Sequence, residues 1–167
     1  MSSLSLRACL VAGFVALIPA LAAAKSYTIP DPNPIAVVTI PDDWEVTETK
    51  KGIEVDSEDE EVYVAVEVTE MNDVAKTIAD TIVWLQSKKV VIDASTQQQQ
   101  EININGIPGF MVKWTGKDDD GPTNVSLTIL VLSESKGLLL TYWASPDGEK
   151  DNLDALKGII NSLKPVR

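Results

Sequence analysis

Residues 61–70, EVYVAVEVTE, alternate between two sets of side chains, and this stretch decides the fold. One set is made of valines only, at positions 62, 64, 66 and 68, and the other is Tyr63, Ala65, Glu67 and Thr69. A period of two with β-branched residues on one side predicts a strand that buries its valine face.

The period changes directly after this strand. Apolar residues now recur at spacings of three and four, at Val74, Ile78, Ile82 and Leu85. This spacing predicts a helix over about 73–89 with one buried face. Asn72 or Asp73 can cap its first turn, and Lys88 and Lys89 complement its C-terminal dipole.

Further short segments of strand character flank this strand and helix. They lie at 35–40, 44–49, 52–56, 95–105, 107–116, 123–134 and 138–143. Their links are of hairpin length, Asn105-Gly106 above all, so the sheet is predicted to be antiparallel. The last two strands are apolar on both sides, which indicates that both faces of the sheet are covered. A second helix is expected from Asp147 or Asp151 to Leu163. We therefore predict an α+β fold, an antiparallel β-sheet flanked by two main helices in an α/β/α sandwich.

The N-terminal residues 1–24 have the pattern of a cleavable signal peptide. Arg7 precedes an apolar run from Leu10 to Leu21, and Ala22-Ala23-Ala24 offers an A-x-A cleavage site. The apolar run is too short for a membrane anchor, which needs about 20 residues. Cys9 precedes the run instead of ending it, which disfavours a lipoprotein. We expect residues 25–34 to be a proline-rich extended lead-in and residues 35–167 to form a single domain.

Removal of this leader would change which reactive residue types and what net charge the mature protein has. The chain has no His and its one Cys lies in the leader, so the mature protein would have neither residue and no disulfide. Export without disulfides indicates a periplasmic location. Loss of Arg7 would change the net charge from −11 to −12. Such a charge disfavours nucleic acid and anionic membrane surfaces, while it allows basic partners and cations.

The residues needed for most enzyme chemistry are missing. A hydrolase triad needs a base that titrates near neutrality, normally His. Ser-Lys dyads at Ser87-Lys88 and Ser135-Lys136 would need a geometry that adjacency does not provide, and no phosphate loop or nucleophile elbow occurs. A carboxylate-dependent hydrolase of cell-wall sugar is a distant alternative. We predict that the chain is not an enzyme and that it has no catalytic, cofactor-binding or metal-binding residue.

Acidic residues gather at the expected turns, at Asp42-Asp43, from Asp56 to Glu61, and at Asp118-Asp119-Asp120-Gly121. The two larger groups are hereafter the acidic tips, 57–61 and 118–121. They suit solvated turns. They would suit calcium or magnesium only if both converged on one ion, because calcium takes six to eight oxygens. An acidic-loop module that binds a divalent cation or small ligand is therefore the alternative function.

The tryptophans offer a second kind of binding feature. On a helical wheel Trp84 lies about 120° from the centre of the apolar stripe, on a flank. Both Trp84 and Trp44 can be binding anchors or packing lids. Trp114 and Trp143 are expected in the core.

Three motifs in order resemble the PsbP-like superfamily. They are Ile40-Pro41-Asp42-Asp43-Trp44, Asn105-Gly106-Ile107-Pro108-Gly109, and Trp143-Ala144-Ser145-Pro146 with the closing helix that ends Ile160-Asn161-Ser162-Leu163-Lys164-Pro165. This superfamily includes the photosystem protein PsbP, a Ran-binding Mog-type protein and exported bacterial proteins of the DcrB type. The resemblance implies an antiparallel sheet between helices and a non-catalytic role in binding proteins. We therefore expect a soluble periplasmic binding or assembly module whose partner is another envelope protein, with no membrane insertion after cleavage.

Overall fold

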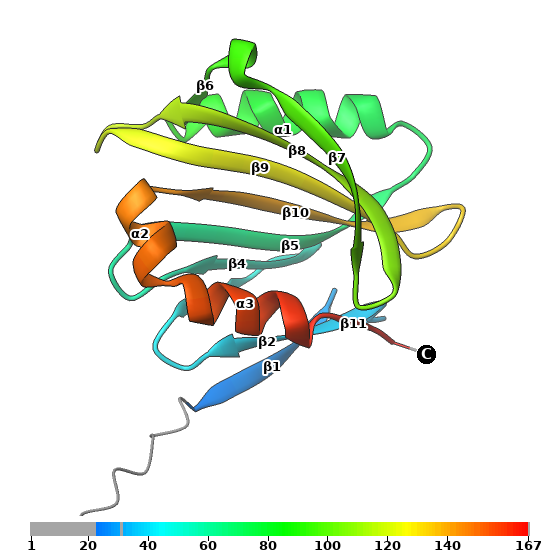
Figure 1. The fold of residues 1–167 in the computed structure, drawn as a ribbon. Coiled ribbons are helices and arrows are strands. Elements are labelled where there is room, and N and C mark those ends of the chain that lie inside the picture. The colour runs from blue at the N-terminus through cyan, green and yellow to red at the C-terminus, as the bar shows by residue number, and fades with distance from the viewer. Residues whose placement is uncertain (1–22, 31, 167) are drawn as a thin grey trace, which may run out of the picture.

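An antiparallel sheet of eight strands runs through the middle of the molecule (Figure 1). The computed structural model describes residues 23–30 and 32–166. The strand order is β3-β4-β5-β10-β9-β8-β6, and β7 also pairs with β8. The strands are β3 (Glu45–Glu48), β4 (Gly52–Asp56), β5 (Val62–Glu70), β6 (Val91–Ile92), β7 (Gln98–Ile104), β8 (Ile107–Lys117), β9 (Pro122–Val131) and β10 (Lys136–Ala144).

The central strand β5 has the alternation that its sequence predicts. Val62, Val64 and Val66 belong to one hydrophobic cluster, while Tyr63 and its neighbours face the other side. β5 pairs with β4 on one side and with β10 on the other. In the β10 pairing Tyr63 lies directly opposite Trp143, and this places the two aromatic side chains on the same face.

Helix α1 (Val74–Ser87) covers part of that second face. Its stripe of Val74, Ile78 and Ile82 packs around Leu85, which is fully buried. The Asp73 carboxylate caps the helix by accepting from the backbone N–H of Lys76 at 3.0 Å. The predicted helix and its cap are confirmed. The cluster under α1 is formed by β8, β9 and β10, so the strip of this face over β4 and β5 carries no helix.

The valine face of β5 is covered by a second sheet and by two helices. The second sheet has the order β1-β2-β11, formed by β1 (Ala24–Ile29), β2 (Ala36–Pro41) and β11 (Lys164–Pro165). α2 (Pro146–Asp151) and α3 (Leu153–Ser162) follow β10, and α3 packs on β2. The antiparallel α+β architecture is confirmed. One face is layered differently from the expectation, because β2 belongs to the small sheet and not to the main one.

The segment 25–34 differs from the expected lead-in. Residues 24–29 form β1, which pairs with β2 from Ala24 opposite Pro41 to Ile29 opposite Ala36. The prolines do not prevent this pairing, since Pro30 comes just after the last paired residue. Residues 1–22 of the predicted signal peptide lie outside the described residues, so its cleavage stays a prediction.

The predicted C-terminal helix is interrupted at Asn152, which ends α2 and precedes α3. The Ser145 hydroxyl caps α2 by accepting from the N–H of Gly148 at 2.9 Å. The predicted strand 95–105 begins later, at Gln98, after a short 3₁₀ turn over Ala94–Thr96.

The turn between β7 and β8 is tied to the end of α3. The predicted Asn105-Gly106 turn has positive φ at both residues. The Asn105 side-chain amide donates to the carbonyls of Ile160 at 2.9 Å and Leu163 at 2.8 Å. It therefore provides a donor to carbonyls at the helix end, where the Ile160 carbonyl also accepts from the N–H of Leu163 at 3.3 Å.

Candidate functional site

Both acidic tips line one surface depression at the end of the sheet, hereafter the acidic groove. It has a volume of about 890 Å³. Residues from the β4–β5 turn, the β8–β9 turn, the end of α1 and the start of α2 surround it. Its acidic residues are Asp59, Glu60, Glu61, Asp118, Asp119, Asp120 and Asp147; its basic residues are Lys88 and Lys89.

Several of these carboxylates serve the turns themselves. Asp118 accepts from the N–H groups of Asp120 and Gly121, both at 3.0 Å, which shapes the β8–β9 turn. Asp119 forms an ion pair with Lys89 from the end of α1. The predicted turn role of this tip is thus confirmed, and it also links the turn to the helix.

The other tip is organised around Asp59. Its carboxylate accepts from the Ser57 hydroxyl at 2.5 Å and from the Asn152 amide at 2.9 Å. The hydrogen bond from Ser57 is the largest of the effects that lower the pKa of Asp59. Burial is the largest cause that raises the pKa of the neighbouring Asp56, and the negative charges of Glu45, Glu54 and Glu60 raise it further.

The convergence of the tips gathers carboxylates without arranging the described ones around a common point. In the part of the chain that the structure describes, no group of three or more His, Cys, Asp or Glu residues is placed to hold a metal ion. Asp118 and Asp119 are directed to the turn and to Lys89. The groove offers negative charge without a coordination shell.

Neither candidate Ser-Lys pair forms a dyad. The Ser87 hydroxyl donates to the carbonyl of Trp84 at 2.6 Å, and the Lys88 ammonium lies 5.5 Å from the centroid of the Trp84 ring. Lys136 forms an ion pair with Glu70. Each lysine therefore has a partner other than the serine beside it.

Three aromatic side chains form one packed group, hereafter the aromatic trio of Tyr63, Trp84 and Trp143. The rings of Tyr63 and Trp143 are stacked at 3.8 Å, and Trp84 lies 5.8 Å from each of them at a tilt. Trp84 is partly buried, as the helical wheel predicts, and in the trio it packs as a lid on the sheet. Trp143, expected in the core, is only partly buried and lines the acidic groove.

The other two tryptophans are packing residues. Trp44 is 6% exposed and belongs to the cluster between the two sheets, which resolves its ambiguity in favour of packing. Trp114 is buried under α1, as expected.

A second depression lies on the other side of the trio, hereafter the glutamate cleft. It occupies about 300 Å³ over the strip of sheet that α1 leaves uncovered. Its polar lining residues are Lys51, Glu54, Glu67, Thr69, Thr77, Asp80, Thr81 and Thr141, and its apolar lining includes Tyr63, Ala65, Trp84 and Leu139.

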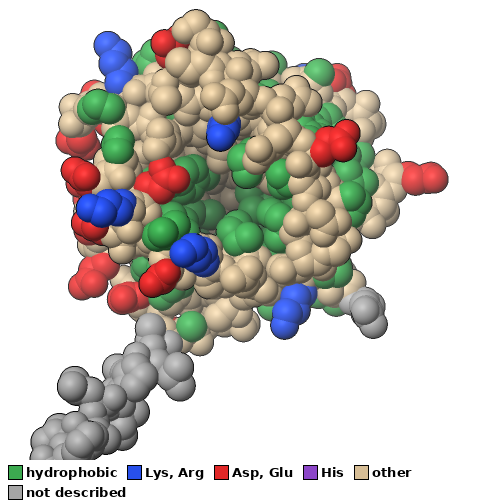
Figure 2. Space-filling view, viewed as in Figure 1, with side chains coloured by type: hydrophobic (Ala, Val, Ile, Leu, Met, Phe, Trp, Pro, Cys, Tyr) green, Lys and Arg blue, Asp and Glu red, His purple; other side chains and the backbone are tan. Residues whose placement is uncertain are grey.

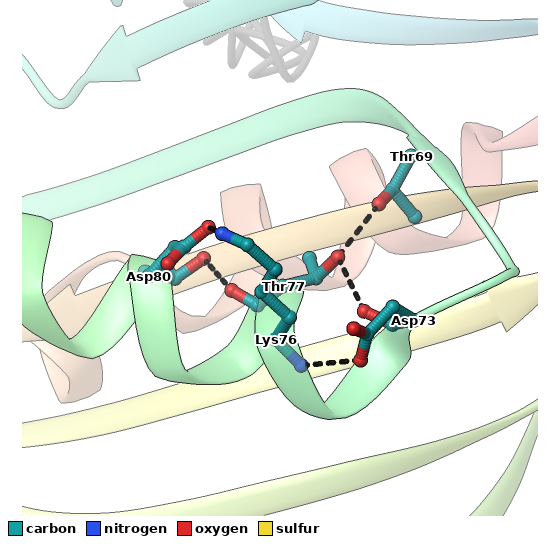
Figure 3. A network of polar contacts seen from close by, with 6 residues as sticks. Thr69, Asp73, Lys76, Thr77 and Asp80 are labelled. Carbon is teal, nitrogen blue, oxygen red and sulfur yellow. Dashed lines mark hydrogen bonds and ion pairs between the residues drawn. The ribbon is translucent and has the colours of Figure 1, made fainter.

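Hydrogen bonds at the start of α1 fix one wall of this cleft, as Figure 3 shows. The Thr77 hydroxyl lies 3.5 Å from that of Thr69 on β5 and donates to the carbonyl of Asp73 at 3.3 Å. One turn further on, Asp80 forms an ion pair with Lys76. The wall is therefore held to both the strand and the helix cap.

The floor of the cleft carries the carboxylates of Glu54 and Glu67, and neither forms an ion pair with the residues that the structure describes. Glu54 lies opposite Ala65, so Tyr63 and Glu67 are its diagonal neighbours on the same face. Burial, together with the charge of Glu54, raises the pKa of Glu67, while Lys51 opposes the rise. The Tyr63 side chain is 6% exposed, and its buried hydroxyl makes no hydrogen bond of normal geometry with the described residues.

This cleft was not predicted from the sequence. The sequence analysis placed Glu67 on the second face of its strand and expected both faces of the sheet to be covered. It gave no role to the charge of Glu67 in the middle of that strand. A glutamate at that position, with Glu54 on the adjacent strand, was the available signal.

A third depression, of about 810 Å³, lies on the opposite face between β7, β8, β9 and α2. Figure 2 shows this face hollowed, with hydrophobic side chains inside the hollow. Its lining includes Met111, Lys113, Ser126, Tyr142 and Glu149. The Gln97–Gln100 run beside it is exposed, in agreement with its expected solvated character.

None of the helices within residues 23–30 and 32–166 has the length and apolar character to cross a bilayer. No protein-family model matches the chain, and no curated protein matches it in sequence.

Solved structures, in contrast, match 85–96% of the chain. The cyanobacterial PsbP of Synechocystis sp. PCC 6803 matches with a TM-score of 0.58 at 10% identity, over 96% of this chain and 99% of its own. LpqN of Mycobacterium tuberculosis, a protein involved in cell envelope biogenesis, matches at 0.57 and 12% identity, over 86% and 92%. The Ran-binding protein Mog1p of Saccharomyces cerevisiae matches at 0.50 and 8% identity, over 85% and 95%. The expected resemblance is confirmed at the level of architecture: this chain has the PsbP-like fold.

Proposed function

We propose that the chain is a non-catalytic binding module of the periplasm, and that it holds a Lys- or Arg-rich segment of another envelope protein in the acidic groove. The observation that carries this proposal is that two acidic tips about 60 residues apart in sequence line one depression. The net charge of −11 steers basic segments toward the molecule in general. The groove gives them a place to bind.

The shape and contents of the groove suit a chain segment. It is open, it has seven acidic residues against two lysines, and Trp143 lines it as an aromatic surface. Tryptophan is enriched among residues that contribute most to binding. Asp59, Asp118 and Asp119 already have partners. The other four carboxylates of the groove, on Glu60, Glu61, Asp120 and Asp147, are the ones available to meet a basic side chain.

The structural neighbours support a role in binding or assembly. LpqN is involved in cell envelope biogenesis, and Mog1p binds Ran. An exported location rests on the signal-peptide pattern of residues 1–24.

Site-specific photo-crosslinking in the native host tests the proposal. A photoreactive phenylalanine replaces Ser87, which lines the groove, in one variant of the full chain. In a second variant it replaces Glu134, in the β9–β10 turn. We expect an adduct only from Ser87, and mass spectrometry should place the crosslink in a Lys- or Arg-rich segment of an envelope protein.

A charge reversal in each tip provides the decisive comparison. Glu60→Lys with Asp120→Lys should abolish the adduct, whereas Glu134→Lys, an exposed carboxylate elsewhere, should leave it intact. An adduct that survives reversal of both tips, or that maps to an acidic or apolar segment, contradicts the proposal.

A further inference from the structure

We propose that the glutamate cleft is a binding site for an alkylammonium group, carried by a free aliphatic diamine or by a lysine side chain of a peptide. This site lies on the other side of the aromatic trio from the acidic groove. It does not depend on the function proposed for that groove.

The carboxylates of the cleft are positioned as a pair. Glu54 and Glu67 are on adjacent strands at diagonal positions of one face. Ala65, which lies opposite Glu54 and two residues before Glu67, has only a methyl group, so its side chain leaves space beside the two carboxylates. Within the described residues neither glutamate forms an ion pair. A cation between them would relieve their repulsion and compensate for their partial burial.

Tyr63 supplies an independent indication of a ligand. Its hydroxyl is buried beside the Glu54 carboxylate but makes no hydrogen bond of normal geometry with the described residues, and a poorly paired buried polar group is costly. Burial, followed by the charges of Glu54, Glu67 and Asp56, raises the pKa of Tyr63, so it stays protonated as a donor. A donor fixed beside two carboxylates can orient one of them while the other receives the ammonium.

The remaining lining suits the carbon chain of an amine. Trp84, Leu139 and Ala65 offer apolar and aromatic surface next to the carboxylates. Lys88 already places its ammonium 5.5 Å from the Trp84 ring centroid, which shows that this indole packs with a cation. A volume of about 300 Å³ is at the small end of ligand sites and fits a linear amine better than a nucleotide.

A metal ion fits this cleft less well than an ammonium group does. Calcium requires six to eight oxygens, and no described group of three carboxylates is arranged for a metal. Asp80, the third acidic residue of the cleft, forms an ion pair with Lys76 at its rim. Two carboxylates and apolar walls match one ammonium head with an aliphatic chain.

Lys51 is the only basic residue that lines the cleft within the described part of the chain, and it competes with any incoming cation. Its charge opposes the raised pKa of Glu67, although the two form no ion pair in the described structure. Removal of this ammonium should therefore strengthen the binding of an amine in the cleft. Nonspecific attraction of a diamine to the whole protein surface would change only weakly.

NMR titration of the ¹⁵N-labelled protein tests the site with 1,5-diaminopentane as the probe and with 1-pentanol and pentanoate as uncharged and anionic counterparts. We expect saturable shifts of the Trp84 indole N–H and of the Ala65 and Leu139 amides with the diamine only. Nα-acetyl-lysine amide provides the peptide arm. Tighter binding of the diamine identifies a free amine as the ligand, and tighter binding of the lysine derivative identifies a side chain.

Matched variants separate the site from general electrostatics. Glu54→Gln with Glu67→Gln should weaken diamine binding by roughly ten- to a hundred-fold, since hydrogen bonds to charged groups are lost. Glu134→Gln should leave it unchanged, and Lys51→Ala should strengthen it by roughly two- to fivefold, as expected for loss of one competing surface charge. The Glu60→Lys/Asp120→Lys variant should retain it, which distinguishes failure at this cleft from failure at the groove. Absence of saturation, equal binding of pentanol, or unchanged affinity in the double glutamine variant overturns the proposal.

Discussion

The rings of Tyr63 and Trp143 are stacked with centroids 3.8 Å and planes 13° apart, on residues directly opposite each other in β5 and β10. This pair forms the partition between the acidic groove, which Trp143 lines, and the glutamate cleft, which Tyr63 lines. Strand register places the two rings side by side on one face of the sheet, where each lines a different depression.

Replacement of Tyr63 by Phe keeps the stacked ring and removes a buried hydroxyl that makes no hydrogen bond of normal geometry with the described residues. We expect the free energy of unfolding to rise by about 1 kcal/mol, because a buried polar group without a hydrogen bond is removed. Urea unfolding measures the change. Tyr27→Phe, at a more exposed tyrosine, should have no effect, and a loss of stability in Tyr63→Phe would show that the hydroxyl has a stabilising partner.

Replacement of Glu67 by Gln should stabilise the protein at neutral pH. The folded-state pKa of Glu67 is raised, first by burial and then by Glu54, so its ionised form opposes folding. That penalty is present at pH 7 and disappears as the pH falls below about 4.3, where the group is protonated in both states. The stability difference from wild type should shrink over this range. Glu134→Gln should give a difference near zero at every pH, and a constant difference in Glu67→Gln would exclude this explanation.

Two glycine-to-alanine changes should have opposite effects on stability. A Cβ at Gly52 would lie 1.9 Å from the carbonyl oxygen of Val66, so we expect a loss of about 3 kcal/mol or more. A Cβ at Gly158, in the exposed middle of α3, meets nothing within 4 Å, and we expect a gain of about 0.5–1 kcal/mol. Thermal unfolding of both variants checks the pair, and a tolerated Gly52→Ala would contradict the strand register.

Asn105→Gly isolates the contacts between the β7–β8 turn and α3. Glycine accepts the φ of 53° but lacks the amide that donates to Ile160 and Leu163. We expect a loss of about 1 kcal/mol from the missing hydrogen bonds. Asn105→Ala should cost more, since it adds backbone strain. Equal stability of wild type and Asn105→Gly would mean that the carbonyls are as well satisfied by water.

Calcium and magnesium should leave the protein unchanged. The acidic groove has no described carboxylate group arranged for an ion, so we expect no shift in Tm with either cation at millimolar concentration. Calorimetric titration gives the complementary measurement. A saturable heat signal that disappears in Glu60→Gln/Asp120→Gln would instead favour the acidic-loop cation module.

The strong periodicities in the sequence located most elements. The valines of β5 identify a strand by their period of two, although β5 is buried on both faces from Val62 to Val66. The apolar stripe of α1 identifies a helix that is buried on one side only. Local signals also located the turns at Asn105-Gly106 and at Asp118–Gly121. The PsbP-like resemblance of three separated motifs agrees with the fold.

The features that the sequence did not predict depend on contacts between distant segments. β1 was assigned no partner because its prolines suggested a lead-in, yet its register with β2 ends at Ile29. The predicted C-terminal helix is broken at Asn152, because α2 ends at Asp151 and α3 begins at Leu153. The approach of the two tips and the pairing of Glu54 with Glu67 follow from strand order, which periodicity does not specify.

The main sheet ends in β3 at one edge, and in β6 and β7, which pair with successive parts of β8, at the other. β3 is four residues long, and two of these are the exposed Glu45 and Glu48. β7 is seven residues long and begins with three consecutive glutamines, with Glu101 as its only charged side chain. Short or charged outer strands resist pairing with other molecules, whereas a long strand with few charges invites it. Self-association through β-strand addition should therefore begin at β7, with Glu101 as the residue that opposes it.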